Sequence, residues 1–489
     1  MALTIPELFE AAVADVPDKA WLLHAEQTFT YAQARERIDR AAGALAERGV
    51  GPGSLVLATA HNRPEYLFAW LAVSYLGGIH VAVDPRSTEA ELEGLIAQVE
   101  PVVVVDDGSV DALFAEAAPP LEGPGPAAPD DPAVLIPTSG TTGRSKLVTQ
   151  TQRAYAMAGE GFPWWMELTA DDRLMTSLPL FHINAPAYSV LGSVAARASL
   201  VLLPRFSASG FVDSARRYGA TEFNAIGAML EILMRQPERA DDADNPLRLC
   251  YTGPSPTEER QLEIERRFGL RIVCGYAMSE TPYGTVWARG TRPYGTLGSI
   301  RQHPTLGEVN EGRVVRDGRP VAAGEVGELQ LRNPAVMRGY WGMPEETGRV
   351  LLPDGWLRTG DLVRDNGDGT LTFIGREKEV IRRRGENVAP AEIEEVLMSH
   401  PDVLEAAVVG VPSELSEEEI KAFVVLRDAA AAELPGIREW AAERLTRFKV
   451  PRYIESVADL PHTPTGRVAK HRLERERSQR EVDFEAGGR

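Results

Sequence analysis

Helical and strand periodicities alternate along the first 300 residues. Residues 34–48 place apolar side chains at helical spacing and stop before Gly49, which predicts an amphipathic helix. Short apolar runs at residues 54–60 and 102–105 predict buried strands. This alternation predicts an α/β fold in which helices and sheets form layers.

One apolar stretch, residues 66–83, invites comparison with a membrane span. Gly77 and Gly78 interrupt it, and it contains His80. A span needs about 20 predominantly apolar residues. The stretch therefore predicts a buried helix, a turn and a buried strand, and we expect no membrane partner.

Strand and turn signals dominate residues 307–373. Residues 366–369 (Asn-Gly-Asp-Gly) share residue types with a calcium-binding loop but lack its other acidic ligands and closing glutamate, so they predict a hairpin turn. From about residue 379 the pattern predicts a compact α+β unit of two helices (391–399, 434–445) and two strands (406–411, 422–425). The charged last stretch, residues 472–489, is expected to be frayed.

Composition narrows the function classes. A chain of 489 residues exceeds one compact domain, so we expect at least two. Cys250 and Cys274 are its only cysteines, which excludes a disulfide scaffold and indicates a reducing cytoplasm. The N-terminus lacks the features of a signal peptide. The net charge of -19 argues against nonspecific nucleic-acid binding, which needs a basic surface.

A glycine- and hydroxyl-rich loop follows the short apolar strand expected at residues 133–137. Residues 138–146 contain five hydroxyls, two glycines and a final lysine. Glycines let backbone N–H groups converge on one point and hydroxyls add donors, as a polyphosphate requires. The loop lacks the Gly-Lys-Ser/Thr of a Walker motif. By itself it is compatible with a surface turn or a phosphate site.

Five further segments follow this loop in a fixed order: residues 179–182, 251–255, 275–280, 355–361 and 375–381. Together with the loop they resemble the signature motifs of the adenylate-forming superfamily, which includes acyl- and aryl-CoA ligases, nonribosomal-peptide adenylation domains and luciferases. The resemblance covers about residues 5–473. Ala277 and Ser279 stand where the family has Gly and Thr.

The resemblance implies a two-domain architecture. A large N-terminal domain, residues 1–377, would combine layered α/β subdomains with a β-barrel-like subdomain and bind ATP and the acid. A small mobile α+β domain, residues 378–489, would rotate about a hinge near Lys378. A few residues at the end of an element can absorb such a rotation.

The resemblance also implies an ATP site. The loop would bind the β- and γ-phosphates through Thr138, Ser139, Gly140, Thr141, Thr142, Gly143 and Lys146. Tyr276 would stack on adenine, Ser279 would donate to the α-phosphate, and Glu280 would hold Mg²⁺, which prefers carboxylate and phosphate oxygen. An adenine-side turn would comprise Gly253, Pro254 and Ser255.

Asp361 would accept hydrogen bonds from the ribose hydroxyls, and Arg376 would donate to the sugar or the phosphates. His182, counted with the catalytic residues, stands where amino-acid-activating relatives carry aspartate, so a free α-amino acid is disfavoured. Three consecutive arginines begin at residue 382. They fit a solvated face or nucleic-acid contact, but the resemblance favours coenzyme A bound at Arg384 and Gly385.

One position departs from the family. Relatives carry a catalytic lysine directly after a glycine near the C-terminus, but Arg467 follows Gly466 here and the nearest lysine is Lys470. Arginine neutralises phosphate charge but has a larger, planar fork. Either Arg467 does the work, or Lys470 does, or the first half-reaction is slow; we favour Lys470.

The implied activity is ATP- and Mg²⁺-dependent adenylation of a small carboxylic acid, followed by transfer to coenzyme A. Segments 419–425 and 448–451 resemble ligases of the carnitine/crotonobetaine type. The pocket for the acid would be lined by residues 181–187, 223–229 and 278–283. Two alternatives stay open: adenylation of another oxyacid, such as nitrite, with a non-CoA acceptor, or a nucleotide-binding protein without enzymatic activity. Any carrier protein would be a separate chain, and the sequence does not give the oligomeric state.

Overall fold

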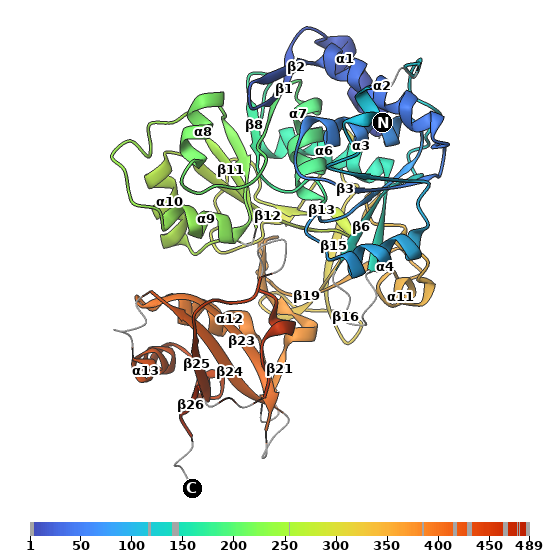
Figure 1. Ribbon diagram of the computed structural model, residues 1–489. Helices are drawn as coiled ribbons and strands as arrows, with labels where there is room; N and C mark the ends of the chain where they lie inside the picture. The colour runs from blue at the N-terminus through green and yellow to red at the C-terminus, as the bar shows by residue number, and fades with distance from the viewer. Residues whose placement is uncertain are drawn as a thin grey trace. The chain divides into compact units, whose positions relative to one another are not determined.

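The computed structural model describes residues 4–115, 119–138, 146–253, 255–383, 386–413, 418–427, 433–462, 468–476, 478 and 480–485. The chain divides into two compact units (Figure 1). Unit 1 comprises residues 1–312 and 330–358, and unit 2 comprises residues 313–329 and 359–489. The α/β class with a large N-terminal part and a smaller C-terminal part is confirmed, whereas the mobile boundary near Lys378 stays a prediction.

Unit 1 contains a nine-stranded sheet. Its order is β14 (Ser299–Ile300), β13 (Thr281–Val286), β12 (Arg271–Met278), β11 (Leu249–Thr252), β10 (Glu222–Asn224), β8 (Arg173–Thr176), β9 (Ser199–Leu202), β1 (Ala20–His24) and β2 (Gln27–Thr30). The six strands from β12 to β1 are parallel, and β13, β14 and β2 extend the sheet antiparallel.

A second sheet of unit 1 has six strands. Its order is β18 (Gly339–Tyr340), β7 (Lys146–Thr151), β6 (Pro132–Thr138), β4 (Ile79–Ala82), β3 (Leu55–Thr59) and β5 (Val103–Asp106). The predicted strand at 102–105 is this edge strand. It is only partly buried, because Val102 and Val104 are 50% and 40% exposed. The prediction of a buried strand was therefore wrong there: among the described residues, β5 is the last strand at this edge of the sheet.

Helices cover both sheets of unit 1. They are α1 (Ile5–Asp15), α2 (Tyr31–Glu47), α3 (Pro64–Tyr75), α4 (Glu89–Val99), α5 (Ala112–Ala115), α6 (Gln152–Met166), α7 (Leu191–Ala195), α8 (Phe211–Tyr218), α9 (Gly227–Met234), α10 (Glu258–Phe268), α11 (Pro344–Val350) and a π-helical turn, η1 (Ala185–Val190). One apolar core joins the first three helices and α6 to strands of both sheets. Non-directional burial of this apolar surface holds the layers together.

Local signals explain where helices begin. Thr30 caps α2: its hydroxyl accepts from the amide of Gln33, whose side chain accepts from the amide of Thr30. This capping box satisfies two otherwise unpaired donors, so the helix starts three residues before the predicted one. The apolar stretch at 66–83 forms α3, a turn at Gly77 and β4, as predicted. In the part of the chain that the structure describes, no helix has the length and apolar character to cross a bilayer.

Most residues of two further sheets and a hairpin belong to unit 2. The first sheet orders β16 (Arg319–Pro320), β15 (Glu311–Arg316), β17 (Val326–Arg332), β19 (Leu357–Asp365) and β20 (Leu371–Arg376); the second orders β23 (Val403–Pro412), β24 (Glu418–Leu426), β25 (Tyr453–Val457) and β26 (Glu481–Asp483). The hairpin pairs β21 (Ile381–Arg383) with β22 (Glu386–Val388). Short 3₁₀ turns lie at Glu377–Glu379, Arg447–Lys449 and Lys470–Arg472. The predicted turn at 366–369 joins β19 to β20 and is confirmed.

Helices α12 (Pro390–Met398) and α13 (Leu434–Arg444) share an apolar core with β23, β24 and β25 (Figure 1). The chain end departs from prediction. Residues 481–483 form β26, and the ion pair of Asp483 with Arg452, 3.0 Å between Oδ1 and Nε, helps to hold it. Charge density suggested a frayed tail, but these charges have partners on the sheet, so that prediction was wrong for residues 480–485.

Candidate active site

Four predicted ligand-binding segments meet at one edge of the nine-stranded sheet. Segments 179–182, 223–229 and 251–255 lie at or just after the ends of β8, β10 and β11, and segment 275–280 covers the end of β12 (Figure 1). These strands are adjacent and parallel, so their carboxyl ends share that edge. In open α/β sheets, ligands bind outside the carboxyl ends of the strands.

The adenine-side turn touches the strand that carries Tyr276. A Cβ added at Gly253 would lie 2.3 Å from the carbonyl oxygen of Gly275. Only glycine permits so close an approach of two backbones. Tyr276 is partly exposed, and its hydroxyl lies 3.6 Å from the sulfur of Met278. Gly253, the first residue of the predicted turn, therefore lies against the residue that precedes Tyr276.

A second group of contacts connects the end of the phosphate loop to Glu280. The Lys146 ammonium lies 5.0 Å from the centre of the Tyr340 ring, and the Tyr340 hydroxyl donates to Glu280 Oε1 at 2.9 Å. Burial, and then the nearby Glu280 carboxylate, raise the pKa of Tyr340, so this hydroxyl keeps its proton. Lys146 also pairs with Glu346, 2.6 Å from Nζ to Oε2.

Main-chain contacts fix this arrangement. Gln150, on β7, donates to the carbonyl oxygen of Ser279 at 2.6 Å, and the amide of Met337 donates to the carbonyl oxygen of Glu280 at 2.8 Å. Strand β18 pairs with β7, which places Tyr340 opposite Val148. The two sheets of unit 1 therefore meet at the predicted phosphate and metal residues. Sequence reasoning missed Tyr340, Gln150 and Glu346, since each acts only through a partner far away in sequence.

The segment that carries His182 is held from another loop. The Asn62 amide donates to the carbonyl oxygen of Leu178 at 2.9 Å and accepts from the amide of Leu180 at 3.0 Å. His182 is partly exposed, and its ring lies 4.5 Å from the Phe181 ring. The contacts of Asn62 therefore fix the backbone just before His182.

Asp361 and Arg376 belong to unit 2. They face each other across β19 and β20, and Arg376 Nε lies 3.2 Å from Asp361 Oδ1. The side chain of Asp361 is 3% exposed, and the backbone amide of Asp361 donates to the Thr359 hydroxyl oxygen at 3.1 Å. The structure thus brings together the two residues predicted at the sugar, with the guanidinium oriented on the carboxylate.

Lys470 has two acidic partners in unit 2. Its ammonium lies 2.7 Å from Glu394 Oε1 and 3.2 Å from Glu379 Oε2. Burial raises the pKa of Glu394, and the Lys470 charge opposes that shift. Moving Lys470 to a phosphate would leave a buried carboxyl without its cation, which is costly. This pairing weighs against the preference for Lys470 as the catalytic cation.

The basic run does not form one solvent-facing surface. Arg382 is exposed, but Arg383 is 1% exposed, pairs with Glu419 at 2.6 Å (Nε to Oε2), and donates to the carbonyl oxygens of Phe448 and Val450 at 2.9 Å each. Arg383 therefore has its partners within unit 2, and the coenzyme A role of Arg384 and Gly385 stays a prediction. The remaining predicted residues lie outside the described ones: Ser139, Gly140, Thr141, Thr142, Gly143, Pro254, Arg384, Gly385 and Arg467.

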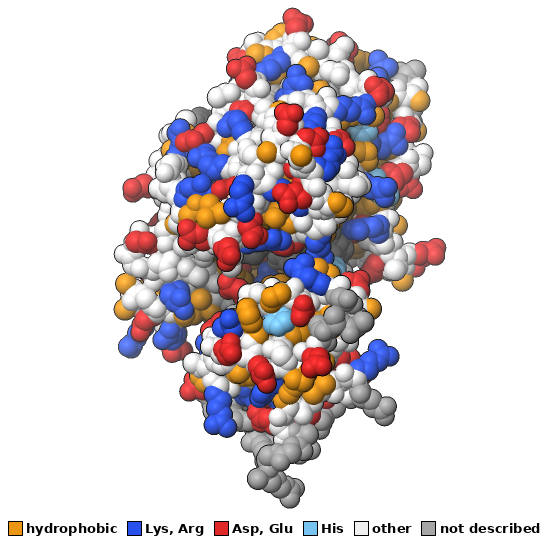
Figure 2. All heavy atoms as spheres, turned by 90° about the vertical axis from the view of Figure 1, so that its left-hand side faces the viewer, with side chains coloured by type: hydrophobic (Ala, Val, Ile, Leu, Met, Phe, Trp, Pro, Cys, Tyr) orange, Lys and Arg blue, Asp and Glu red, His pale blue; other side chains and the backbone are white. Residues whose placement is uncertain are grey.

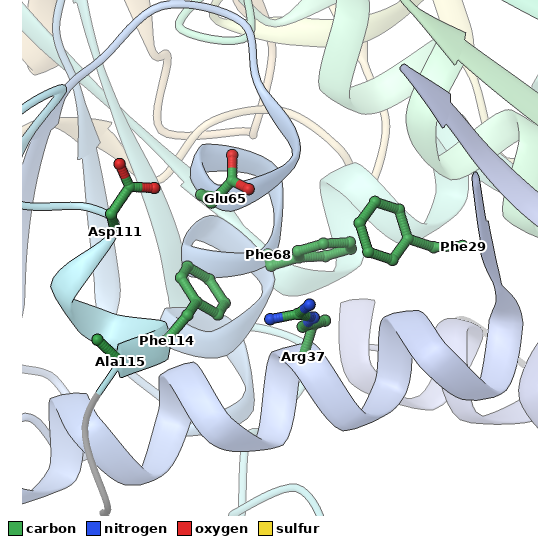
Figure 3. Close-up of a pocket in the computed structure, with 7 residues that line it drawn as sticks. All are labelled: Phe29, Arg37, Glu65, Phe68, Asp111, Phe114 and Ala115. Carbon is green, nitrogen blue, oxygen red and sulfur yellow. The ribbon is translucent and has the colours of Figure 1, made fainter. Parts of the chain in front are cut away.

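A surface pocket of about 300 Å³ lies elsewhere in unit 1, among β2, α2, α3 and α5. Figure 3 shows the rings of Phe29, Phe68 and Phe114 with the Arg37 guanidinium beside them. None of the residues predicted at the nucleotide lines this pocket. The face drawn in Figure 2 carries acidic and basic side chains intermixed, without a continuous basic patch of the kind that nucleic acids require.

Comparison with known proteins identifies the family. Residues 9–341 match the AMP-binding enzyme family, and residues 392–467 match the AMP-binding enzyme C-terminal domain. The chain is 31% identical over 486 residues to a crotonobetaine/carnitine–CoA ligase of Salmonella agona, with 91% of this chain and 93% of the relative covered. It is 35% identical over 428 residues to a sulfoacetate–CoA ligase of Cupriavidus necator, covering 86% and 80%.

Solved structures agree with this assignment. ATP-bound MatB from Rhodopseudomonas palustris superposes with a TM-score of 0.88 at 27% identity, covering 96% of this chain and 98% of that one. O-succinylbenzoate coenzyme A synthetase from Bacillus subtilis, in complex with AMP, gives 0.87 at 27% identity, covering 97% and 99%. The resemblance inferred from the sequence motifs is confirmed: the chain belongs to the AMP-binding enzyme family, within the adenylate-forming superfamily.

Proposed function

We propose that this protein adenylates a small carboxylic acid with ATP, releases pyrophosphate, and transfers the acyl group to coenzyme A. The observation that carries the proposal is the contact chain from Lys146 through Tyr340 to Glu280, at the end of the predicted phosphate loop. The names of the relatives support it, because the curated relatives given above are all CoA ligases.

In the first stage, a carboxylate oxygen of the acid attacks the α-phosphorus in line, and the bond to the pyrophosphate oxygen breaks. Carboxylates are ionised at neutral pH, so the step needs no general base. The protein contributes positioning and charge neutralisation. Lys146 would neutralise charge on the β- and γ-phosphates, and Ser279 would donate to the α-phosphate.

Glu280 fits a magnesium ligand. Its carboxylate is partly exposed at the end of a strand, and the Tyr340 hydroxyl donates to one of its oxygens at 2.9 Å. Mg²⁺ in nucleotide sites uses one or two carboxylates together with substrate phosphates. Bound there, the ion would supply positive charge at the phosphates, while Tyr340 orients the carboxylate.

In the second stage, the coenzyme A thiol attacks the carbonyl carbon of the acyl-adenylate, the thiol proton is lost, and AMP leaves. A rotation near Lys378 would bring the acceptor side of the small domain, with Arg384 and Gly385, to the adenylate. Lys378 is exposed in a 3₁₀ turn, Glu377–Glu379, a position where backbone rotation disturbs little packing.

Pyrophosphate release tests the function. The assay uses the purified full chain with aliphatic acids, aromatic acids and nitrite, each with and without coenzyme A. Release with one carboxylic acid, together with an acyl-CoA product, supports the proposal. Pyrophosphate release that is unchanged by coenzyme A and yields no acyl-CoA supports the alternative with a non-CoA acceptor. No release with any acid favours a nucleotide-binding protein without enzymatic activity. Glu280→Gln should lower release by about 100-fold, as loss of a charge-stabilising group does.

The departure near the C-terminus is tested in the same assay. We propose that the adenylation cation is Arg467 or Lys470, and that the two carboxylates of Lys470 favour Arg467. Arg467→Ala should then abolish pyrophosphate release, while Lys470→Ala lowers thermal stability and retains release per folded molecule. The reverse pattern would return the role to Lys470.

A further inference from the structure

Arg301 is a fully buried cation that no sequence motif singled out. It follows β14 and is 1% exposed. Among the described residues, the ion pairs include none between Arg301 and a carboxylate. An arginine side chain that leaves water without an acidic partner needs other compensation, because desolvating a charge is costly.

Four oxygen atoms supply that compensation. Nε donates to the carbonyl oxygen of Thr285 at 2.9 Å, and one terminal nitrogen donates to the Tyr188 hydroxyl at 2.9 Å and to the carbonyl oxygen of Pro282 at 3.2 Å. The other terminal nitrogen donates to the Tyr251 hydroxyl. The guanidinium therefore binds to three separate elements: η1, β11 and β13.

Aromatic rings enclose the same group. The guanidinium carbon lies 4.5 Å from the centre of a Trp165 ring, 5.2 Å from that of Tyr188 and 5.5 Å from that of Tyr251. The negative faces of such rings attract a cation, more strongly when water is excluded. Charge is thus stabilised without being cancelled by an anion.

Arg301 contacts one of the three segments predicted to line the acid directly and is connected to the other two through Tyr188 and Tyr251. The segments are residues 181–187, 223–229 and 278–283. Pro282 lies within the last of these, and Tyr188 directly follows the first. The backbone carbonyl of Tyr251 accepts from the amide of Ala225 at 2.8 Å, which connects the second. The Tyr188 hydroxyl in turn donates to the Pro282 carbonyl at 2.5 Å, so two of the segments are also joined to each other.

Arg301 also contacts the strand predicted to carry the adenine-binding residue. A Cβ added at Gly275 would lie 2.8 Å from a terminal nitrogen of Arg301. Gly275 immediately precedes Tyr276, the residue predicted to stack on adenine. Arg301 thus packs against the backbone between the acid side and the adenine side of the predicted site.

Only arginine suits this position. Its planar fork offers five donors in fixed directions, whereas lysine is a point charge with three. Lysine would keep the charge and lose the simultaneous bonds to β11, η1 and β13. The pair Arg301→Lys and Arg301→Met therefore separates geometry from charge.

We infer that Arg301 is the positioning residue that sets the spacing of the acid-lining segments and so selects among acids; this rests on the proposed function. It does not touch the reacting atoms. Because no carboxylate pairs with Arg301 among the described residues, we expect its positive charge to favour anionic substrates over neutral analogues of the same shape.

The test measures KM and kcat for the acid and KM for ATP, by pyrophosphate release from the full chain, for wild type, Arg301→Lys and Arg301→Met. Displacements of about 1 Å in a site can cost about 100-fold. We expect Arg301→Lys to raise the acid KM about tenfold with the ATP KM within about twofold. Arg301→Met should raise it further and change the ranking of acids in the panel.

Arg267→Lys is the matched control. Arg267 is also a buried arginine of unit 1, with a side chain 9% exposed, but it pairs with Asp242 at 2.8 Å and lies on α10, outside the predicted site. It should lose thermal stability without any change in acid KM. A purely structural role for Arg301 would make its variants behave in the same way.

The outcomes are distinct. No release from wild type with any acid overturns the proposed function. Release from wild type, with Arg301→Lys keeping the acid KM and acid ranking, overturns the role of Arg301 alone. If Arg301→Met fails to fold, the acid KM values of Arg301→Lys and Tyr188→Phe test the inference instead. Tyr188→Phe removes one acceptor, so it should raise the acid KM in the same direction by a smaller factor, and an unchanged KM in both variants counts against the inference.

Discussion

Individual buried cations in the two units are stabilised in opposite ways. In unit 1, Arg301 is surrounded by tyrosine hydroxyls, carbonyl oxygens and aromatic rings. In unit 2, Arg383 pairs with Glu419, and Lys421, 0% exposed, lies 3.0 Å from Glu455 Oε2 and 2.8 Å from Glu481 Oε2. Among the described residues no carboxylate pairs with Arg301, although unit 1 also contains the paired Arg267. The charges of Arg383 and Lys421 are matched or exceeded by carboxylates.

This difference has a physical consequence. A paired buried cation is a local structural device: it fixes the strands that carry the partners and leaves little field outside. A buried cation without an acidic partner leaves its field uncancelled, at a place predicted to receive an anion. The contrast separates buried charge pairs, which hold elements together, from the buried charge that we propose favours a negatively charged substrate.

Lys421→Met should give the largest effect. It leaves Glu455 and Glu481 buried without their cation, and breaking such a pair costs about 3–5 kcal/mol. Hydrogen exchange, read by mass spectrometry for β23 to β26, should show loss of protection in unit 2 with unit 1 unchanged. Adding Glu455→Gln and Glu481→Gln should restore much of the protection. Equal exchange in wild type and Lys421→Met would remove the contrast between the units.

Glu222 is a buried carboxyl for which the described residues show no ion pair, so it should make stability depend on pH. It is 0% exposed on β10, and burial, with the nearby Asp172 carboxylate, raises its pKa well above the ordinary value. The unfolded state therefore loses its proton first as pH rises, and stability falls above the unfolded pKa, by up to about 1.4 kcal/mol per pH unit. Urea unfolding between pH 5 and 8 should show a shallower decline for Glu222→Gln. Parallel curves for the two proteins would contradict this.

Asp172 should show the opposite pH dependence. Burial tends to raise its pKa, but hydrogen bonds from Arg248, Thr169 and Thr221 outweigh burial and lower it. Its contribution is present above the unfolded pKa and is lost as pH falls through the folded one. Asp172→Asn should lose about 2 kcal/mol at pH 7, the scale of hydrogen bonds to a charged group. The loss should shrink below about pH 4, which unfolding curves at pH 3.5 and pH 7 would check.

Glu346→Gln should give the smallest effect. Glu346 pairs with Lys146 at 2.6 Å, and hydrogen bonding to Lys146 is the largest cause of its lowered pKa. In the proposed site, Glu346 competes with the ATP phosphates for Lys146. Removing its charge should lower the KM for ATP about two- to threefold, which matches the free energy of an exposed ion pair. The change should vanish at high salt because screening removes it. A higher KM would mean that Glu346 positions Lys146 for the nucleotide.

The motif residues could be named from the sequence because their chemistry is local to the chain, and their ligand roles stay predictions. The glycines at 253 and 275, the aromatic ring of Tyr276 and the carboxylate of Glu280 could be named without coordinates. The four segments could be expected together because they follow strands of one sheet. Tyr340 could not, since β18 is two residues long and its importance comes from pairing with β7.

Charge density is a poor guide at two places for one reason. The tail at 480–485 was predicted to be frayed, and the arginines from residue 382 were compatible with a solvated face, because a sequence does not show which charges will face each other. In the structure, Asp483 meets Arg452 and Arg383 meets Glu419. Partners about 30 residues apart cannot be paired by periodicity.

The sequence by itself determined the α/β class, the order of the motifs and the family to which they belong, because hydrophobic periodicity and motif chemistry are encoded by neighbouring residues. Only the tertiary structure decided which buried charges are cancelled and which are not. Arg301 illustrates this: its partners come from three elements that follow different strands, and the energy of a buried charge depends on the groups around it in space.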